Sequence, residues 1–189
     1  MIRRPPRSTL DRSSAASDVY KRQAHWHLLL NHFPIILSVI GTGFIVASFI
    51  FKKQHLKFAS LLLIILAAAF TIPAFATGEP AEEQVEEISG VTHEAIHEHE
   101  EIAEKGRIVI FITGGLAFIT LLLLHFKKKS VQMFMILTLL ASAGSAGILS
   151  YVGYTGGEIR HSEIRGDFNF GKKDKPAKET NIPVVEDDD

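Results

Sequence analysis

Four runs of apolar residues, each about twenty residues long, organise this chain. Twenty is the number of residues that an α-helix needs to cross the hydrocarbon core of a bilayer. Short charged or glycine-containing segments separate the runs, which predict transmembrane helices at about residues 28–51, 58–76, 108–126 and 131–154. We therefore expect an all-α fold, a four-helix transmembrane bundle, within a membrane domain that covers residues 24–165.

The entrance to the first run is rich in histidine, with His25, His27 and His32. Two helix starts fit this stretch. Asn31 caps a helix that holds Pro34 in its first turn, or the helix begins near Trp26 and Pro34 kinks it. Because histidine is costly inside a bilayer, several at the mouth of a spanning helix indicate a functional site.

An acidic segment separates the second run from the third. The tetrapeptide Thr77-Gly78-Glu79-Pro80 predicts the end of the second helix. From about Thr92 onward, the pattern predicts a short amphipathic helix that leads into the third span. At 100° per residue, His99 lies near the centre of the apolar stripe of this helix, whereas His93 and His97 lie on the glutamate-rich face. We expect His99 to point towards the bundle and the other two to face water.

Small residues within the runs predict close approaches between helices. They are Gly41 and Gly43 in the first run and Ala143, Gly144 and Gly147 in the fourth. The same glycines would leave room for a flat macrocycle between the helices.

The two ends of the chain depart from this pattern. Residues 1–23 resemble a translated sequencing adapter, and we expect them to be non-native. The alternative is a targeting peptide, which the lack of an apolar segment disfavours. Residues 166–189 are polar and rich in Lys and Asp, so we expect a disordered tail.

Composition narrows the chemistry. The chain contains no cysteine, which excludes disulfides, thiolate metal sites and iron–sulfur clusters within it. Its formal net charge of −1 gives no reason to expect nucleic acid as a partner. Since no nucleophile–base arrangement is evident, we assign no catalytic residue and favour an electron-transfer or accessory protein over a stand-alone enzyme.

Lysine positions predict the orientation in a bacterial inner membrane. Clusters lie in the two short loops, at Lys52, Lys53 and Lys57 and at Lys127, Lys128 and Lys129. The positive-inside rule makes these loops cytoplasmic and both termini extracytoplasmic. Counting against this orientation are basic residues that flank spans on the other side, at Lys105, Arg107, Arg160 and Arg165.

The topology gathers most histidines on one side of the membrane, leaving only His55 and His125 on the other. Imidazoles from different helices, converging near one membrane surface, can ligate haem iron axially. We therefore expect b-type haem near the extracytoplasmic surface, held by His27, His32, His99 and His161. A hydrogen bond at the interface would explain any one of them, but four in one layer favour a site.

Two other functions remain open. A divalent transition metal could bind the same histidines together with glutamates of the loop. The stretch His93-Glu94-Ala95-Ile96-His97 matches the His-Glu-x-x-His pattern of zinc proteases, which makes His93 and His97 alternative metal ligands, although a solvated acidic face explains the match equally. The third function is an accessory membrane subunit without a cofactor. The expected partners are the lipid bilayer and other redox membrane or periplasmic proteins.

Three motifs together resemble a bacterial family of small four-span membrane proteins known as a domain of unknown function. They are His27-Leu28-Leu29-Leu30-Asn31-His32-Phe33-Pro34, His99-Glu100-Glu101 and Gly156-Gly157-Glu158-Ile159-Arg160-His161. The resemblance covers residues 24 to about 165, and Leu28 stands where the family often has proline. Some relatives are fused to Rieske or cytochrome c modules, which implies a redox role with b-type haem.

Overall fold

The computed structural model describes residue 19, residues 22–86 and residues 91–161, and within these it is helical throughout apart from short connections. The labelled helices are α2 (His32–Phe51), α3 (Gln54–Ala76), α4 (Gly78–Glu86), α5 (His93–His125) and α6 (Val131–Arg160). The expected tail, residues 166–189, and nearly all of the expected adapter-derived segment lie outside the described residues. The all-α fold class predicted from the sequence is confirmed.

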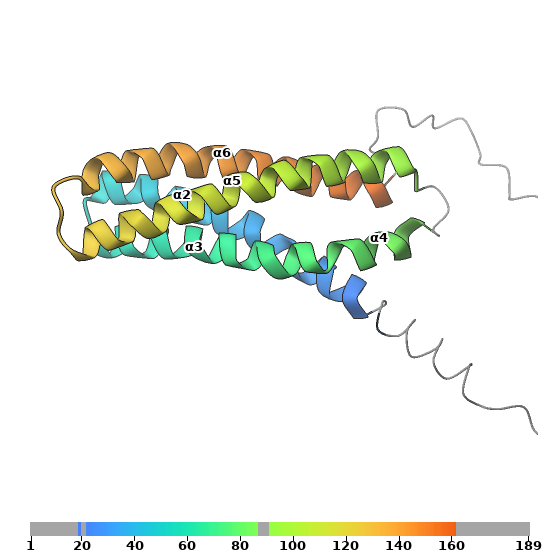
Figure 1. The fold of residues 1–189 in the computed structure, drawn as a ribbon. Helices are drawn as coiled ribbons and strands as arrows, with labels where there is room; N and C mark the ends of the chain where they lie inside the picture. Colours follow the sequence, from blue (N-terminus) through green and yellow to red (C-terminus); the bar gives the residue numbers. More distant parts are fainter. Residues whose placement is uncertain (1–18, 20–21, 87–90, 162–189) are drawn as a thin grey trace, which may run out of the picture.

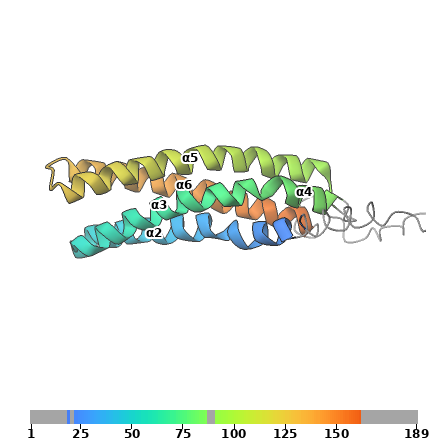
Figure 2. The same ribbon diagram turned by 60° about the horizontal axis from the view of Figure 1, so that its bottom comes forward.

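Four helices are long and apolar enough to cross a membrane, at Arg22–Phe51, Gln54–Ala76, His93–His125 and Val131–Ile159. They run antiparallel as two hairpins (Figure 1), in which α2 pairs with α3 and α5 pairs with α6. Contacts of α3 with α5 and of α2 with α6 close the four helices into a ring. Both views place the α2–α3 and α5–α6 connections at one end, which we call the loop end (Figure 2). The opposite end carries residues 22–30, α4, the start of α5 and the end of α6, and we call it the histidine end.

The first spanning helix begins earlier than either sequence alternative predicts. Residues 22–30 are already helical, and the helix is interrupted at Asn31 before α2 continues from His32. Asn31 has helical backbone angles and makes no capping hydrogen bond with its side chain, so the prediction of an Asn31 cap is wrong. Pro34 explains the interruption, because its ring nitrogen cannot donate a hydrogen bond to the carbonyl of Leu30 one turn earlier.

The acidic segment after α3 is more ordered than the sequence pattern predicts. α3 ends at Ala76 with Thr77 as its C-cap, and the chain re-enters a helix at Gly78 as α4, with Glu79 in its first turn. α5 is a single helix of 33 residues, so the amphipathic stretch and the third span are continuous. Thr92 caps it as expected, because its side-chain oxygen accepts a hydrogen bond from the Ala95 amide at 3.3 Å.

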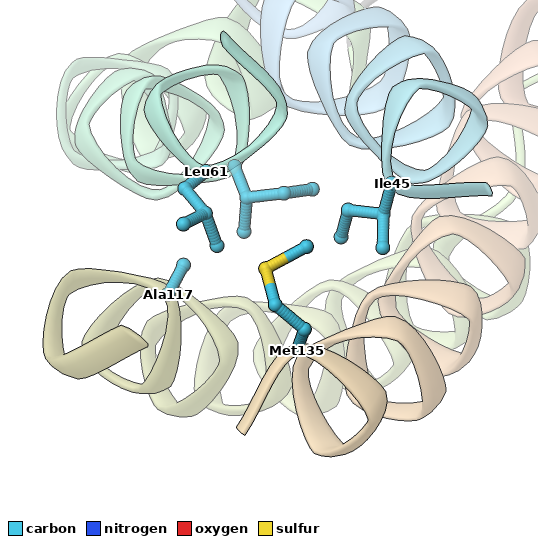
Figure 3. Close-up of a cluster of buried hydrophobic side chains, with 5 residues drawn as sticks. Ile45, Leu61, Ala117 and Met135 are labelled. Atoms are coloured by element: carbon cyan, nitrogen blue, oxygen red, sulfur yellow. The ribbon is translucent and has the colours of Figure 1, made fainter. Parts of the chain in front are cut away.

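Buried positions recur three and four residues apart along each long helix, the spacing of knobs-into-holes packing. On α2 they are Pro34, Ser38, Gly41, Ile45 and Ser48. At one level near the loop end, all four long helices contribute apolar side chains to a common centre (Figure 3): Ile45 from α2, Leu61 and Ile64 from α3, Ala117 from α5 and Met135 from α6. A second apolar cluster holds Ala67, Ala68, Ile110 and Leu149. Hydroxyl pairs also line the interior and join α5 to α6: Thr113 to Ser145 at 2.7 Å and Thr120 to Thr138 at 2.9 Å.

The outer surface is the apolar one. Large side chains such as Ile50, Ile112 and Leu140 are about two-thirds exposed, at 67%, 65% and 66%. A membrane protein can place such residues outward because lipid solvates them, and its helices then associate through small residues and hydrogen bonds. The distribution agrees with an integral membrane protein.

Only some of the glycines that were expected to lie at close helix contacts do so. A Cβ on Gly41 would lie 2.8 Å from Ile64, whereas Gly43, Gly144 and Gly147 have no neighbour within 4 Å. The expected close contacts at Ala143 and Gly147 are therefore wrong, since both residues are exposed on the outer face of α6. The tightest approach is at Gly114, where a Cβ would lie 2.5 Å from the Cβ of Ala68.

Gly114→Ala should destabilise the bundle by about 1–3 kcal/mol, because α3 and α5 must separate to admit the methyl group. Gly115→Ala is the matched control: its Cβ would meet nothing within 4 Å, so the expected change is below about 0.5 kcal/mol. Reversible unfolding in mixed micelles with increasing SDS measures both. Equal effects of the two substitutions would contradict the α3–α5 contact.

Candidate functional site

The histidine end brings two imidazole rings towards the bundle interior. His27 and His99 are half-buried, and they lie close enough for their charges to interact. His27 belongs to residues 22–30, and His99 lies near the start of α5. The prediction that His99 points towards the bundle is confirmed, since its ring meets α6.

His27 is held by the end of α3. Its Nδ1 lies 2.9 Å from the carbonyl oxygen of Ala74 and 3.4 Å from Oγ1 of Thr77. A carbonyl oxygen can only accept, so Nδ1 carries the hydrogen. The Ala74 carbonyl is available because it lies in the last turn of α3, where carbonyl groups lack partners within the helix.

His99 is held in a similar way by the end of α6. Its Nδ1 lies 3.1 Å from Oγ1 of Thr155, and the Thr155 hydroxyl donates to the carbonyl of Val152 at 3.1 Å. Since the hydroxyl hydrogen is used on Val152, Oγ1 accepts from His99, and Nδ1 again carries the hydrogen. In the neutral form of both rings, Nε2 is therefore left with a lone pair.

The other two histidines predicted as haem ligands lie elsewhere. His32 is exposed, and its Nδ1 bonds to the Leu28 carbonyl of its own helix at 2.9 Å. Its position five residues after His27 rotates it about 140° around the helix, away from the bundle axis. His161 is exposed at the end of α6. The expected layer of four histidines is therefore reduced to the pair His27 and His99.

The alternative metal ligands do not form a cluster either. His93 and His97 are exposed, and His93 lies 3.3 Å from Glu86. Within the described segments, no group of three or more His, Asp or Glu side chains could hold a metal ion. A pocket of about 380 Å³ lies at the loop end instead, between Phe58, Leu121 and His125.

Asn31 adds a polar atom that the sequence did not single out. It follows His27 by one helical turn, so the two residues share a face of the helix. Its Oδ1 is buried and has no hydrogen-bond partner in the described part of the chain. Buried polar atoms are nearly always paired, so an unpaired acceptor beside His27 favours a bound donor or cation here.

Threonine and glycine complete the surroundings of both rings. A Cβ on Gly78 would lie 3.6 Å from Cε1 of His27, and one on Gly156 would lie 3.0 Å from Cε1 of His99. Thr77, Gly78, Thr155 and Gly156 were not predicted as site residues. The signal that would have found them is a recurrence of Thr-Gly followed by Glu, at Thr77-Gly78-Glu79 and at Thr155-Gly156-Gly157-Glu158.

A pair of carboxyl groups lies beside this site. A hydrogen bond to the Glu100 side chain, with burial and the charges of Glu100, Glu86 and Glu79, raises the pKa of Glu82 to about 7. Glu82 is on α4 and Glu100 follows His99 on α5. One shared proton therefore joins α4 to α5.

No family model matches the chain, and neither a curated protein nor a solved structure shows significant similarity to it.

The contact of α4 with α5 should weaken as pH rises. Glu82 binds a proton more tightly in the folded chain, because its pKa is about 7 there against 4.5 for a free carboxyl. The stabilising contribution is complete below pH 4.5 and is lost as pH rises through about 7. Hydrogen exchange of the α4 amides should thus show weaker protection at pH 8 than at pH 5.5, after correction for intrinsic exchange rates.

Glu82→Gln is the matched variant, since an amide donates the same hydrogen bond without titrating. Its α4 protection should be independent of pH over this range. Glu83→Gln changes an exposed neighbour and should leave the wild-type pH dependence intact. An unchanged pH dependence in Glu82→Gln would contradict the shared proton.

Proposed function

We propose that this chain binds b-type haem near the extracytoplasmic surface of the bacterial inner membrane, through His27 and His99, and serves in electron transfer. One observation carries the proposal. Two imidazoles from different helices use Nδ1–H on neighbouring acceptors, Ala74 and Thr155, which leaves Nε2 of each neutral ring with a lone pair. Ligating histidines typically donate the second ring nitrogen in this way.

The number of ligands favours haem over an isolated metal ion. An isolated transition-metal ion in a protein generally needs three or four ligands from the chain. Haem iron already has four nitrogens from its macrocycle and needs one or two more. A pair of imidazoles, without a third titratable ligand among the described residues, suits the second case.

The chain's own residues would hold and orient the group. His27 and His99 would supply the ligating nitrogens, Ala74 and Thr155 would fix the two ring planes, and Gly156 would leave space beside the His99 ring. Haem, when bound, supplies one-electron chemistry. The resemblance to a four-span family, some members of which are fused to Rieske or cytochrome c modules, supports the same role.

The orientation follows from the charges of the two ends. The loop end carries Lys52, Lys53 and Lys57 with Lys127, Lys128 and Lys129, and the positive-inside rule assigns it to the cytoplasm. Arg107 lies on the histidine side, but its guanidinium is stacked 4.1 Å above the Phe75 ring. The histidine pair would then face the extracytoplasmic surface, within reach of redox membrane or periplasmic partners.

A divalent transition-metal ion is the second candidate, and Asn31 is the observation that favours it. With the Asn31 oxygen, the site would offer three lone-pair donors from two helices. An accessory role without a cofactor is the third possibility, in which the two histidines only bond neighbouring helices.

The test is an absorption spectrum of the full chain, purified from membranes of a haem-replete host, with and without dithionite. We expect a Soret band and a sharp α band on reduction. His27→Ala or His99→Ala should reduce haem content at least tenfold, because each removes an axial ligand. His32→Ala and His161→Ala are matched controls and should keep the wild-type spectrum, since both residues are exposed.

Metal analysis of the same preparations separates the alternatives. A stoichiometric transition metal without a Soret band, lost in His27→Ala, would replace the haem proposal with the metal one. No haem and no metal in the wild-type protein would favour the accessory role and overturn both.

A further inference from the structure

The two hairpins present a histidine in the same structural context. In each, a histidine near the start of the first helix meets a Thr-Gly pair near the end of the returning helix. His27 and Thr77 are 50 residues apart, and His99 and Thr155 are 56 residues apart. No sequence repeat predicts this equivalence, because the hairpins share little beyond these few positions.

The surroundings of the two rings differ in the acceptor that contacts Nδ1. His27 donates to a backbone carbonyl at 2.9 Å, with Thr77 as a longer second contact at 3.4 Å. His99 donates to a side-chain hydroxyl, that of Thr155, at 3.1 Å. The Val152 carbonyl, one turn before Thr155 as Ala74 is one turn before Thr77, also bonds the His99 ring. Substitution of Thr155 therefore removes the hydroxyl acceptor of His99, whereas substitution of Thr77 removes only the longer contact of His27.

Each threonine is itself oriented by the helix that carries it. The Thr77 hydroxyl donates to the Pro73 carbonyl at 2.8 Å, and the Thr155 hydroxyl donates to the Val152 carbonyl. A hydroxyl that has used its hydrogen can act only as an acceptor towards a third group. Each threonine therefore selects the ring tautomer with hydrogen on Nδ1 and rejects the one with hydrogen on Nε2.

We propose that Thr77-Gly78 and Thr155-Gly156 are equivalent imidazole sockets, which position His27 and His99 as a matched pair of ligands, one from each hairpin. Thr155 is the positioning residue on which His99 depends. This inference rests on the proposed function in one respect: if haem is bound, His27 and His99 would hold it between the two hairpins. The sockets themselves do not depend on which group binds.

The ring tautomers can be measured without any bound group. The full chain, labelled with ¹⁵N-histidine and purified without haem in micelles, gives ring ¹⁵N shifts and long-range ¹H–¹⁵N correlations that distinguish the tautomers. His27→Gln and His99→Gln assign the signals. Both residues should show hydrogen on Nδ1 in the wild-type protein at a pH where the rings are neutral.

Threonine variants then separate a socket from simple packing. Thr155→Val should weaken the Nδ1–H preference of His99 without changing side-chain volume much, because only the Val152 carbonyl remains as an acceptor, and Thr155→Ser should restore the preference. Thr77→Val is the matched control, because Ala74 still accepts from His27. A wild-type His99 with hydrogen on Nε2, or an unaltered tautomer in Thr155→Val, would overturn the proposal.

A second readout uses the loaded protein. If haem is present, Thr155→Val should weaken its retention by roughly 10–100-fold, the usual effect of removing a partner of a ligating histidine. Thr77→Val should change retention by much less. Tautomers as expected in a chain that never binds haem would leave the sockets standing and reject only the haem proposal, so the two failures are distinguishable.

Discussion

The hydrogen on Nδ1 of His27 and of His99 is the feature on which the site depends. Each hydrogen is committed to an acceptor on a returning helix, Ala74 in one hairpin and Thr155 in the other. This commitment fixes the ring plane, ties the start of one helix to the end of the next, and leaves the second nitrogen as an electron-pair donor. Without it, the two residues would be ordinary interfacial histidines that rotate freely.

The bundle can bring the rings together because small residues at the helix contacts let the helices approach closely. Gly41, Gly114 and Gly153 each admit a neighbouring side chain so closely that an added Cβ would lie within 3 Å of it. Helices in lipid gain nothing from burying large apolar groups against one another, so contact distance and hydrogen bonds determine how they associate. Most of the large apolar residues accordingly lie outside, and the interior combines glycine, alanine and hydroxyl side chains with two small apolar clusters.

Much of this architecture follows from the sequence, for physical reasons that also set its limits. Runs of apolar residues predict spans because the bilayer thickness fixes a helix length, and the phase of His99 follows from helical periodicity alone. Phase also separates His32 from His27, but it cannot tell which of two faces is the inner one until neighbouring helices are placed. The sequence also cannot tell which glycine lies at a helix contact. Gly114 packs against a neighbouring helix and Gly115 has open space beside it, yet nothing local in the sequence distinguishes them.

The partners of the rings were beyond such reasoning because they are remote in the chain. An interaction between residues 50 or 56 positions apart depends on where two helices end relative to each other. The Thr-Gly recurrence at Thr77 and Thr155 is too short to be noticed without that knowledge. The prediction that Asn31 caps a helix fails for a related reason. The helix already begins ten residues before His32, so Asn31 lies within the span and its side-chain oxygen is buried.

The reduction from four histidines to two alters which ligand the site suits. Four convergent imidazoles would fit an isolated metal ion as well as haem, because an ion without a macrocycle takes its whole coordination shell from the protein. Two imidazoles, one from each hairpin and each with Nδ1 hydrogen-bonded, give such an ion too few ligands unless the Asn31 oxygen also binds it. A macrocycle would remove that shortage, since it brings four ligands of its own and needs only one or two more from the chain.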